Sequence, residues 1–432
     1  MSITRRNLIL AGGLGTAGLT LAACGGGSPA KQDEDVTDIT VVSGNNPWVQ
    51  GLEKHLDRYA EETGVAVHLD TYGNEQLNDQ YKVKLNASDD TFDVMVFQVQ
   101  DVAREFARNG WLLDVTDRVE AESDWGWDDF QEAAREAVTV DDVVLGVPLM
   151  TERHVVYYRK DLLEKAGMAV PTTLDELEAA AEALHDPGSG MSGIAMRGQA
   201  VAAVTQFSSF LYSFGGDFQA DGASALNSDA AIAAYDYYGR VLREFGPEGV
   251  TSMGWVEASA LFAQGRAAFY LDADSQAYTF LDESSSSVVE TVDFAPFPAG
   301  PAGSKPYSIV PWTAGINSFS RKQDAAWKFI TWATSQGMLT TLMSEDTLPS
   351  PRQSSWDDDA AAGSFPAGLV TNVQATLDGV VGHDRPQVEQ VAQAREYVGA
   401  PIIASINGED VPAAATKADE QLQELIDAEA PA

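Results

Sequence analysis

Amide, carboxylate and aromatic side chains follow two predicted strands in the N-terminal part of the chain. The candidates are Asn46 and Trp48 after a strand at 39–42, and Gln98, Gln100 and Asp101 after a strand at 94–97. The carboxyl ends of strands are where α/β sheets place ligands. Carboxylates and amides there can bind hydroxyl groups, and an aromatic ring can cover a flat apolar face. Two alternatives remain open: Trp48 can begin the apolar stripe of its helix, and Asp101 can cap the helix that follows it.

Further candidates follow predicted strands and turns in the middle of the chain. They are Arg197 after a strand at 194–196, Trp255 and Glu257 after Gly254, and Asp272 and Asp274 after a strand at 267–271. A carboxylate accepts charge-assisted hydrogen bonds, which are roughly twice as strong as neutral ones, and an arginine can donate to two adjacent oxygens. We expect Asp272 to be the main carboxylate of the site. The alternatives are a solvated loop charge for Arg197 and a cap of the following segment for Asp272.

The sequence carries no motif for catalysis, metal binding or cofactor binding. The five His residues form no HxxxH or HxH pair, so a dedicated zinc site is not expected. The single cysteine excludes an intramolecular disulfide. The nucleophile motif GxSxG and the nucleotide-binding motif GxxxxGKS or GxxxxGKT are absent. One enzymatic alternative remains, a glycoside hydrolase, because the 65 acidic residues will include some pair about 5 to 10 Å apart.

The balance of charges is strongly acidic. The chain has 27 Lys and Arg against 65 Asp and Glu, which gives a formal net charge of −38. A phosphate backbone would repel such a chain, so nucleic acid is not an expected partner. The same balance argues against a basic patch that docks on anionic lipid. The surplus of acids is typical of a soluble surface and identifies no ligand.

The first thirty residues indicate an export signal rather than a part of the fold. Arg5 and Arg6 precede an apolar run at 8–23 that is too short for a permanent membrane span. The segment around the two arginines is similar to a twin-arginine signal, and an ordinary secretory signal is the alternative. We therefore expect a signal peptide at residues 1–23.

The only cysteine, Cys24, ends the run LAAC and is followed by a polar stretch. Small residues before a cysteine at this place resemble a bacterial lipobox, which implies cleavage before Cys24 and diacylation of its thiol. Two acyl chains anchor a protein stably, whereas one does not. We expect residues 24–37 to form a lipid-anchored tether. The protein would then lie outside the cytoplasm, on the outer face of the cell membrane.

Beyond the tether, strand-like and helix-like segments alternate. The predicted strands and extended segments are 39–42, 65–69, 94–97, 155–158, 267–271 and 309–316. The predicted helices include 48–59, 77–85, 102–106, 162–166, 173–177, 232–242, 326–333 and 415–426. This alternation favours an α/β fold with parallel sheets and right-handed crossovers. No internal repeat and no transmembrane span is apparent.

Several segments resemble the sugar-binding proteins of ABC importers, the family-1 extracellular solute-binding proteins. The matching segments are VP (147–148), VVYYRKDLLEKAG (155–167), PTTLDEL (171–177), FGGD (214–217), LFAQGRAAF (261–269), AGIN (314–317) and AAWKFITWATS (325–335). WATS at 332–335 and LDA at 271–273 are similar to the polyol-binding branch, of the sorbitol and mannitol type. TERH at 151–154 departs from the small residues of that branch. The resemblance spans essentially the whole mature chain.

The resemblance implies an α/β fold of two lobes, of the type II periplasmic-binding-protein kind. Each lobe would be a mainly parallel sheet flanked by helices, and a hinge would join the lobes. The chain would cross between them near Met150, Trp312 and Trp356. The N-terminal lobe would then comprise residues 38–150 and 312–355, and the C-terminal lobe residues 151–311 and 356–432.

Their place at these crossings makes Glu152, Arg153 and Trp312 further site candidates. The alternatives are an exposed ion pair for the first two and a core ring for Trp312. The resemblance implies a monomer without cofactor that captures a sugar or polyol between its lobes and delivers it to an ABC permease in the membrane. No bond would be made or broken. A carbohydrate-binding lipoprotein without a transport role is a remaining alternative.

Overall fold

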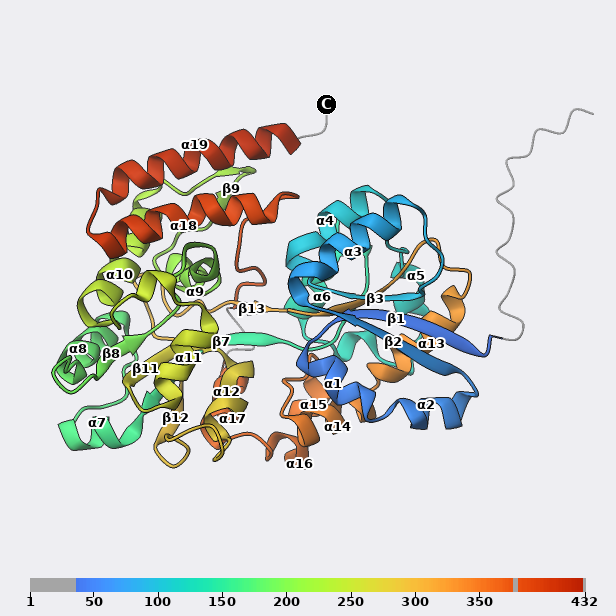
Figure 1. Cartoon of the computed structure of the whole chain (residues 1–432), viewed down its shortest axis with the longest axis horizontal. Helices are drawn as coiled ribbons and strands as arrows, with labels where there is room; N and C mark the ends of the chain where they lie inside the picture. Colours follow the sequence, from blue (N-terminus) through green and yellow to red (C-terminus); the bar gives the residue numbers. More distant parts are fainter. Residues whose placement is uncertain (1–35, 376–379, 430–432) are drawn as a thin grey trace, which may run out of the picture.

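The computed structural model describes residues 36–375 and 380–429, which form two α/β lobes (Figure 1). In Figure 1 the first lobe is drawn mainly in blue and orange, and the second mainly in green, yellow and red. The expected signal peptide at 1–23, Cys24 and the tether up to residue 35 lie outside the described residues.

The first lobe is built on a sheet with the strand order β2-β1-β3-β14-β6. Its strands are β1 (Asp38–Gly44), β2 (Ala66–Tyr72), β3 (Val94–Phe97), β6 (Val147–Pro148) and β14 (Thr313–Ile316). β1 pairs in parallel with β2 and β3, whereas β14 runs antiparallel to β3 and β6. Every residue of β3 is buried, as expected of an apolar run covered on both faces. β2 alternates between exposed and half-buried residues over most of its length, which suits an edge strand.

The sheet of the second lobe has the strand order β12-β7-β11-β8, and β13 pairs with the start of β7. The strands are β7 (Glu152–Arg159), β8 (Ser192–Ala195), β11 (Ala267–Ala273), β12 (Val292–Pro296) and β13 (Ser308–Ile309). Alternate residues of β7 face different cores: Val156 and Tyr158 belong to one, Val155 and Tyr157 to another. This sheet is therefore buried on both faces.

Both sheets are mixed, so the prediction that each is mainly parallel is wrong. In the second sheet only β11 and β8 are parallel, while β7 is antiparallel to β11, β12 and β13. Parallel neighbours need a crossover such as a helix, and β1, β2 and β3 are joined in this way. β14 and β7 instead pair with strands far away in the sequence. Their directions follow from the long-range path of the chain, which a local alternation of strand and helix does not reveal.

Helices surround the two sheets (Figure 1). Before β7 these are α1 (Pro47–Glu53), α2 (Leu56–Thr63), α3 (Asn74–Asn86), α4 (Val99–Arg108), α5 (Thr116–Ala121), η1 (Trp127–Asp129) and α6 (Glu132–Ala137). Between β7 and β14 they are α7 (Lys160–Ala166), α8 (Leu174–Leu184), α9 (Ala200–Ser213), α10 (Asp229–Phe245), η2 (Val250–Ser252), α11 (Trp255–Ala263), η3 (Asp274–Gln276) and α12 (Ala277–Leu281). After β14 they are α13 (Gln323–Ala333), α14 (Gln336–Asp346), α15 (Gln353–Trp356), α16 (Asp359–Ala362), α17 (Ala367–Ala375), α18 (Val391–Asn407) and α19 (Val411–Glu429). Short hairpins join β4 (Thr139–Val140) to β5 (Val143–Val144) and β9 (Gln219–Ala220) to β10 (Ala223–Ser224).

Local side-chain and glycine signals define several helix ends. Thr173 and Glu176 form the capping box of α8, in which the Glu176 amide donates to Thr173 Oγ1 at 3.2 Å and the Thr173 amide donates to Glu176 Oε2 at 3.3 Å. Gly64 ends α2 with a φ of 75°, which glycine adopts readily. The helical stripe predicted over residues 48–59 is divided into α1 and α2 at residues 54–55.

The buried apolar residues divide between the lobes along the chain. The first-lobe core takes its residues from 39–150 and 310–348; Trp327 lies in it and Trp332 packs against it. The second-lobe cores take theirs from 155–297 and, apart from Met343, from 356–425. Each lobe is thus assembled from separate stretches of the sequence.

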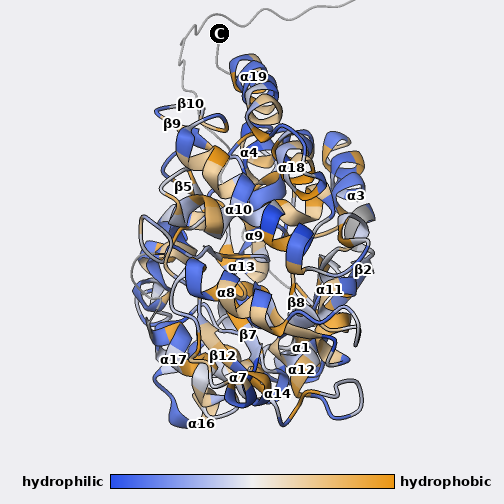
Figure 2. Ribbon diagram, turned by 90° about the vertical axis from the view of Figure 1, so that its left-hand side faces the viewer, coloured by the Kyte–Doolittle hydropathy of each residue, from blue (hydrophilic) through white to orange (hydrophobic). Residues whose placement is uncertain are grey.

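The outer helices carry hydrophilic residues, as Figure 2 shows for α19 and α8. Among residues 36–375 and 380–429, none of the helices combines the length and the apolar character that a bilayer crossing requires.

Candidate ligand-binding site

A cavity of about 650 Å³ lies between the two lobes. Its first-lobe wall comes from the residues after β1 and β3, from α1 and from the segment just before β14. Its second-lobe wall comes from the start of β7, the residues after β8 and β11, and helices α9 and α18. An occupant of this cavity would therefore touch both lobes.

Part of the predicted site lines this cavity. These residues are Asn46, Gln98, Gln100, Glu152, Arg197, Trp255 and Trp312. Asn46, Gln98 and Arg197 follow β1, β3 and β8, as expected for the carboxyl ends of strands. Trp255 is 41% exposed as a residue, and Trp312 is 6% exposed. Contact of these side chains with a ligand remains a prediction.

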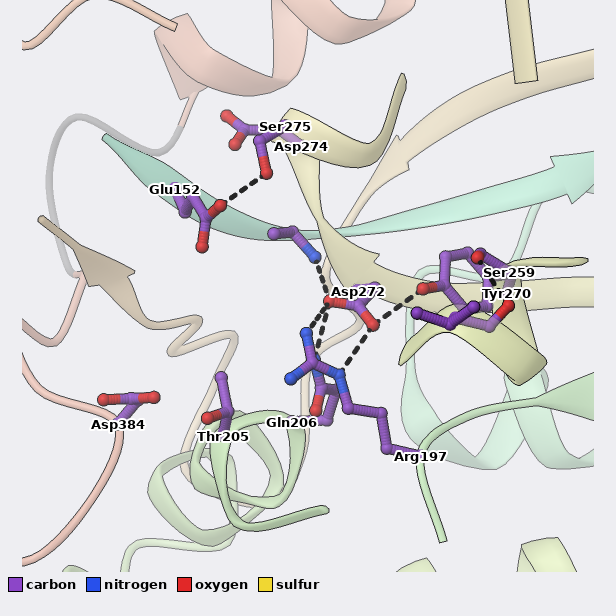
Figure 3. A network of polar contacts seen from close by, with 12 residues as sticks. Glu152, Arg197, Thr205, Gln206, Ser259, Tyr270, Asp272, Asp274, Ser275 and Asp384 are labelled. Atoms are coloured by element: carbon purple, nitrogen blue, oxygen red, sulfur yellow. Dashed lines mark hydrogen bonds and ion pairs between the residues drawn. The ribbon is translucent and has the colours of Figure 1, made fainter. Parts of the chain in front are cut away.

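Arg197 is held in the cavity wall by Asp272 (Figure 3). Arg197 Nε and Nη2 donate to the two carboxylate oxygens of Asp272 at 3.0 and 2.7 Å. Asp272 is fully buried and also accepts from Gln206 Nε2 and from the Tyr270 hydroxyl, each at 2.7 Å. Burial would raise the pKa of Asp272, but Arg197 and the hydrogen bonds outweigh it, so the pKa is lowered. Asp272 therefore stays ionised and fixes the direction of Arg197.

Glu152, the first residue of β7, places a second carboxyl group in the wall (Figure 3). Its Oε1 accepts from Ser275 Oγ at 2.6 Å. Burial raises the pKa of Glu152 to about 7, and Asp274 adds to the rise, although the Ser275 hydrogen bond lowers it. Near its pKa a carboxyl group can donate as well as accept a hydrogen bond. Glu152 can therefore accept a hydrogen bond from a hydroxyl group of a ligand or donate one to its oxygen.

Replacing Glu152 by Gln should weaken the pH dependence of stability. In the folded chain Glu152 keeps its proton up to about pH 7, whereas in the unfolded chain a Glu loses it near about pH 4.3. The folded chain binds more protons in this window, so the contribution of Glu152 to stability is complete below about pH 4.3 and is lost as the pH rises through about 7. Urea unfolding at about pH 5 and about pH 8 should show a smaller fall in the free energy of unfolding for Glu152→Gln than for the wild type. An equal fall in both proteins would contradict the raised pKa.

Arg385 joins the two lobes at the cavity wall. Its Nε and Nη2 donate to the two carboxylate oxygens of Asp384 at 2.8 and 2.7 Å, and its Nη1 donates to Asp101 of α4 in the first lobe. Burial would raise the pKa of Asp384, but Arg385 lowers it to about 2. Arg108 at the end of α4 donates to both oxygens of Glu389 at 2.7 and 2.6 Å. The first-lobe helix α4 is thus tied to the second lobe beside the cavity.

Asp101 and Asp272 do not line the cavity, contrary to the prediction for these two residues. Each is bound instead to an arginine that does line it: Asp101 to Arg385 and Asp272 to Arg197. Since Asp272 has no exposed surface, it acts on the cavity through Arg197.

Trp48, Glu257 and Arg153 also lie outside the cavity lining. Trp48 is 1% exposed and packs in the first-lobe core, which is the alternative that its helical spacing left open. Glu257 accepts from the amide of Gly254 at 2.9 Å and closes the first turn of α11. Arg153 is buried, and its Nη1 lies 3.6 Å from Asp274 Oδ2. Arg153 is therefore neither an exposed ion pair nor a cavity residue.

Other lining residues were not singled out as candidates from the sequence. Among them are Lys54, Ser275, Gln276, Tyr278, Asp346, Arg385 and Arg395. Ser275 and Gln276 follow β11 and could have been found by the rule that strand ends place ligands. Arg385 and Arg395 come from the C-terminal part of the chain, where none of the strands in the described residues lies directly before them and no local sequence pattern marks them.

The wall combines charged hydrogen-bonding groups with aromatic rings, which suits a ligand with hydroxyl groups and an apolar face. Within the part of the chain that the structure describes, no three His, Cys, Asp or Glu side chains are grouped so as to hold a metal ion.

The sequence matches the model of a protein family described as bacterial extracellular solute-binding protein, over residues 45–339. The mannitol-binding protein of Pseudomonas aeruginosa is 30% identical over 250 residues, which cover 57% of the chain and 56% of that protein. The chain thus spans little more than half the length of this relative. The erythritol/L-threitol-binding protein of Mycolicibacterium smegmatis is 24% identical over 395 residues, which cover 82% of each chain.

Among solved structures, an ABC transporter solute-binding protein from Agrobacterium radiobacter, in complex with ribitol, superimposes with a TM-score of 0.79 at 25% identity. The match covers 90% of the chain and 99% of that protein. This similarity over nearly the whole length confirms the two-lobe α/β fold predicted from the sequence.

Proposed function

The chain belongs to the bacterial extracellular solute-binding proteins, and from this we propose that it is the binding protein of an ABC importer for a polyol or a small sugar. The observation that carries the proposal is the cavity between the lobes. Each lobe contributes hydrogen-bonding groups and one tryptophan to its wall, Trp312 from the first lobe and Trp255 from the second. The mannitol, erythritol/L-threitol and ribitol named for its relatives support an acyclic polyol as the ligand class.

The ligand would bridge the lobes. Arg197 and Glu152 would bind its hydroxyl groups from the second lobe, and Trp312 would cover its apolar face from the first. A ligand that touches both lobes binds the closed arrangement better and shifts the population toward it. Closure removes water from the cavity, which strengthens each hydrogen bond inside it. The closed surface would then be recognised by the permease in the membrane.

The lobes would comprise residues 38–150 with 312–355, and 151–311 with 356–432. The division of the buried apolar residues, which changes after Met150, before Val310 and after Leu348, supports these bounds.

The family is extracytoplasmic, and the further proposal is a lipid anchor. Cleavage before Cys24 and acylation of its thiol would hold a monomer to the outer face of the membrane through the tether 24–37. The lipobox pattern LAAC supports this proposal.

A binding role is favoured over glycoside hydrolysis. Hydrolysis needs two carboxyl groups placed on either side of the bond to be cleaved. The carboxylates that line the cavity are Glu152, which binds Ser275, and Asp346, which binds Lys54. The curated relatives are named as binding proteins, which supports release of the ligand unaltered.

A thermal-shift screen with D-mannitol, ribitol, erythritol, glucose and maltose tests the function. A ligand at a hundred times its dissociation constant stabilises the folded chain by about 2.7 kcal/mol, so at least one polyol should raise the melting temperature clearly. Replacing Trp312 by Ala should remove that rise while the chain stays folded by circular dichroism. No shift with any of these compounds, or turnover of one of them, would contradict the proposal.

A further inference from the structure

A set of direct contacts between the lobes lies along one face of helix α4. Three side chains of this helix, spaced i, i+3 and i+7 and therefore on one stripe, each bond to the second lobe. Their partners are alternate residues of the segment 385–389, which leads into α18 opposite α4 (Figure 1). We call this set the α4 clasp; it pairs Asp101 with Arg385, Arg104 with Gln387, and Arg108 with Glu389.

The contacts of the α4 clasp are made by the ends of polar side chains. Arg108 Nη1 donates to both carboxylate oxygens of Glu389 at 2.7 and 2.6 Å. Arg104 Nη2 donates to Gln387 Oε1 at 3.2 Å. The side chains of Arg108 and Glu389 are 56% and 25% exposed. Water can therefore replace these bonds when the lobes part.

The second-lobe half of the clasp is held in place by its own lobe. The amides of Glu389 and Gln390 donate to the two carboxylate oxygens of Glu429 in α19 at 2.7 and 2.9 Å. The amide of Gln387 donates to Gln219 Oε1 at 2.8 Å. The segment 385–389 therefore moves with the second lobe, and the clasp must break when the lobes separate.

Among the described residues, no buried apolar cluster joins the two sides of the clasp. Val102 and Phe106 of α4 belong to the first-lobe core, whereas Val388 belongs to a second-lobe core. A second cavity, of about 220 Å³, lies between α4, residues 136–140 and residues 382–388, so the surfaces are not closely packed. The lobes can therefore part here with both cores intact, and only polar bonds are lost.

The clasp is separate from the hinge and, for the most part, from the ligand cavity. None of the changes of lobe described above falls in α4 or in the segment 385–389. Of the clasp residues, Arg385 alone lines the cavity of about 650 Å³. A pair such as Arg108 with Glu389 therefore acts on ligand binding through the separation of the lobes.

We infer that the α4 clasp is a strap that favours the closed arrangement of the lobes before a ligand binds. The inference goes beyond the proposed function, because it concerns the chain without its ligand. When only a fraction of the molecules is closed and competent to bind, the apparent dissociation constant is the intrinsic one divided by that fraction. A residue that changes only this fraction changes the affinity for every ligand by the same factor.

Replacing Arg108 by Met tests the strap. Calorimetric titration with D-mannitol and with ribitol should show the same loss of affinity, about threefold to fivefold, because exposed ion pairs contribute modestly. Small-angle X-ray scattering of the ligand-free variant should show a larger radius of gyration than the wild type, with an unchanged circular dichroism spectrum. The difference in affinity between wild type and variant should narrow in about 1 M NaCl, where the screening length falls to about 3 Å.

A charge exchange and a control sharpen the test. Arg108→Glu sets a second carboxylate against Glu389 and should lower affinity by about tenfold, and adding Glu389→Arg should restore most of that loss. Arg118→Met is the control. Arg118 of α5 pairs with Asp324 of α13 at 2.6 Å within the first lobe, and their side chains are 28% and 53% exposed. This variant should change neither the affinity nor the radius of gyration.

Two results would overturn the inference while leaving the proposed function in place. One is wild-type scattering and wild-type affinity in both Arg108 variants. The other is a loss of affinity that differs by more than about twofold between the two polyols, as for a residue that touches the ligand. A wild-type chain that binds neither polyol would remove the proposed function alone, since the scattering of the ligand-free chains still decides whether the clasp favours closure.

Discussion

Replacing Asp272 by Asn should lower polyol affinity by at least about a hundredfold and the free energy of unfolding by about 3 to 5 kcal/mol. Asp272 is fully buried and accepts from both Arg197 donors, from Gln206 and from the Tyr270 hydroxyl. An Asn at this place carries no charge and turns an NH₂ group toward those donors. Arg197, whose side chain is 13% exposed, would be left as a cation without a carboxylate, and it would no longer be held in the cavity wall.

Calorimetric titration and urea unfolding of the variant measure the two effects separately. Asp161 provides a matched control, since it also binds an arginine through both oxygens, at 2.7 and 2.6 Å from Arg159, but is 39% exposed and lies outside the cavity lining. Asp161→Asn should cost at most about 1 kcal/mol and leave affinity unchanged. An Asp272→Asn chain with the affinity of the wild type would show that Arg197 does not bind the ligand.

Replacing Arg153 by Met should destabilise the chain by about 3 to 5 kcal/mol at about pH 8. Arg153 is buried beside Asp274, which has no exposed surface. Burial raises the pKa of Asp274 to about 6, although Arg153 lowers it, so removing the guanidinium will raise that pKa further. The carboxyl group of Asp274 then contributes stability at low pH, and this stability is lost as the pH rises through its pKa. The destabilisation should therefore be smaller at about pH 5 than at about pH 8.

Urea unfolding of Arg153→Met at both pH values checks this result. The double variant with Asp274→Asn should recover a large part of the loss, because it leaves no buried charge unpaired. Arg321→Met is the control, since Arg321 is paired with Asp90 but is 86% exposed, and it should cost at most about 1 kcal/mol. A loss for Arg153→Met that is equal at the two pH values would mean that Asp274 does not titrate between them.

Helix ends and buried strands could be predicted where they depend on residues that are close together in the sequence. The capping box of Thr173 and Glu176, the left-handed Gly64 and the apolar run of β3 each depend on residues close together in the sequence. Strand direction was missed because it depends on distant residues: β14 pairs with β3 and β7 with β11 across long stretches of chain. No local periodicity distinguishes a parallel from an antiparallel neighbour.

Residues of the candidate site could be predicted from the sequence where they directly follow a strand. Asn46, Gln98 and Arg197 follow strands and line the cavity. The sequence does not show which carboxylates are paired with an arginine of the same chain. Asp272 and Asp101 were therefore predicted to bind the ligand, whereas in the structure they bind Arg197 and Arg385. These pairs join residues 75 and 284 positions apart, and only the folded chain brings them together.

A crystal structure of the chain grown with D-mannitol or ribitol would show whether a polyol binds in the cavity between the lobes. We expect one polyol molecule in that cavity, with hydroxyl groups bonded to Arg197 and Glu152 and its carbon chain against Trp312. Density for the polyol only at other places on the protein, with the cavity empty at a concentration that saturates the calorimetric signal, would contradict it.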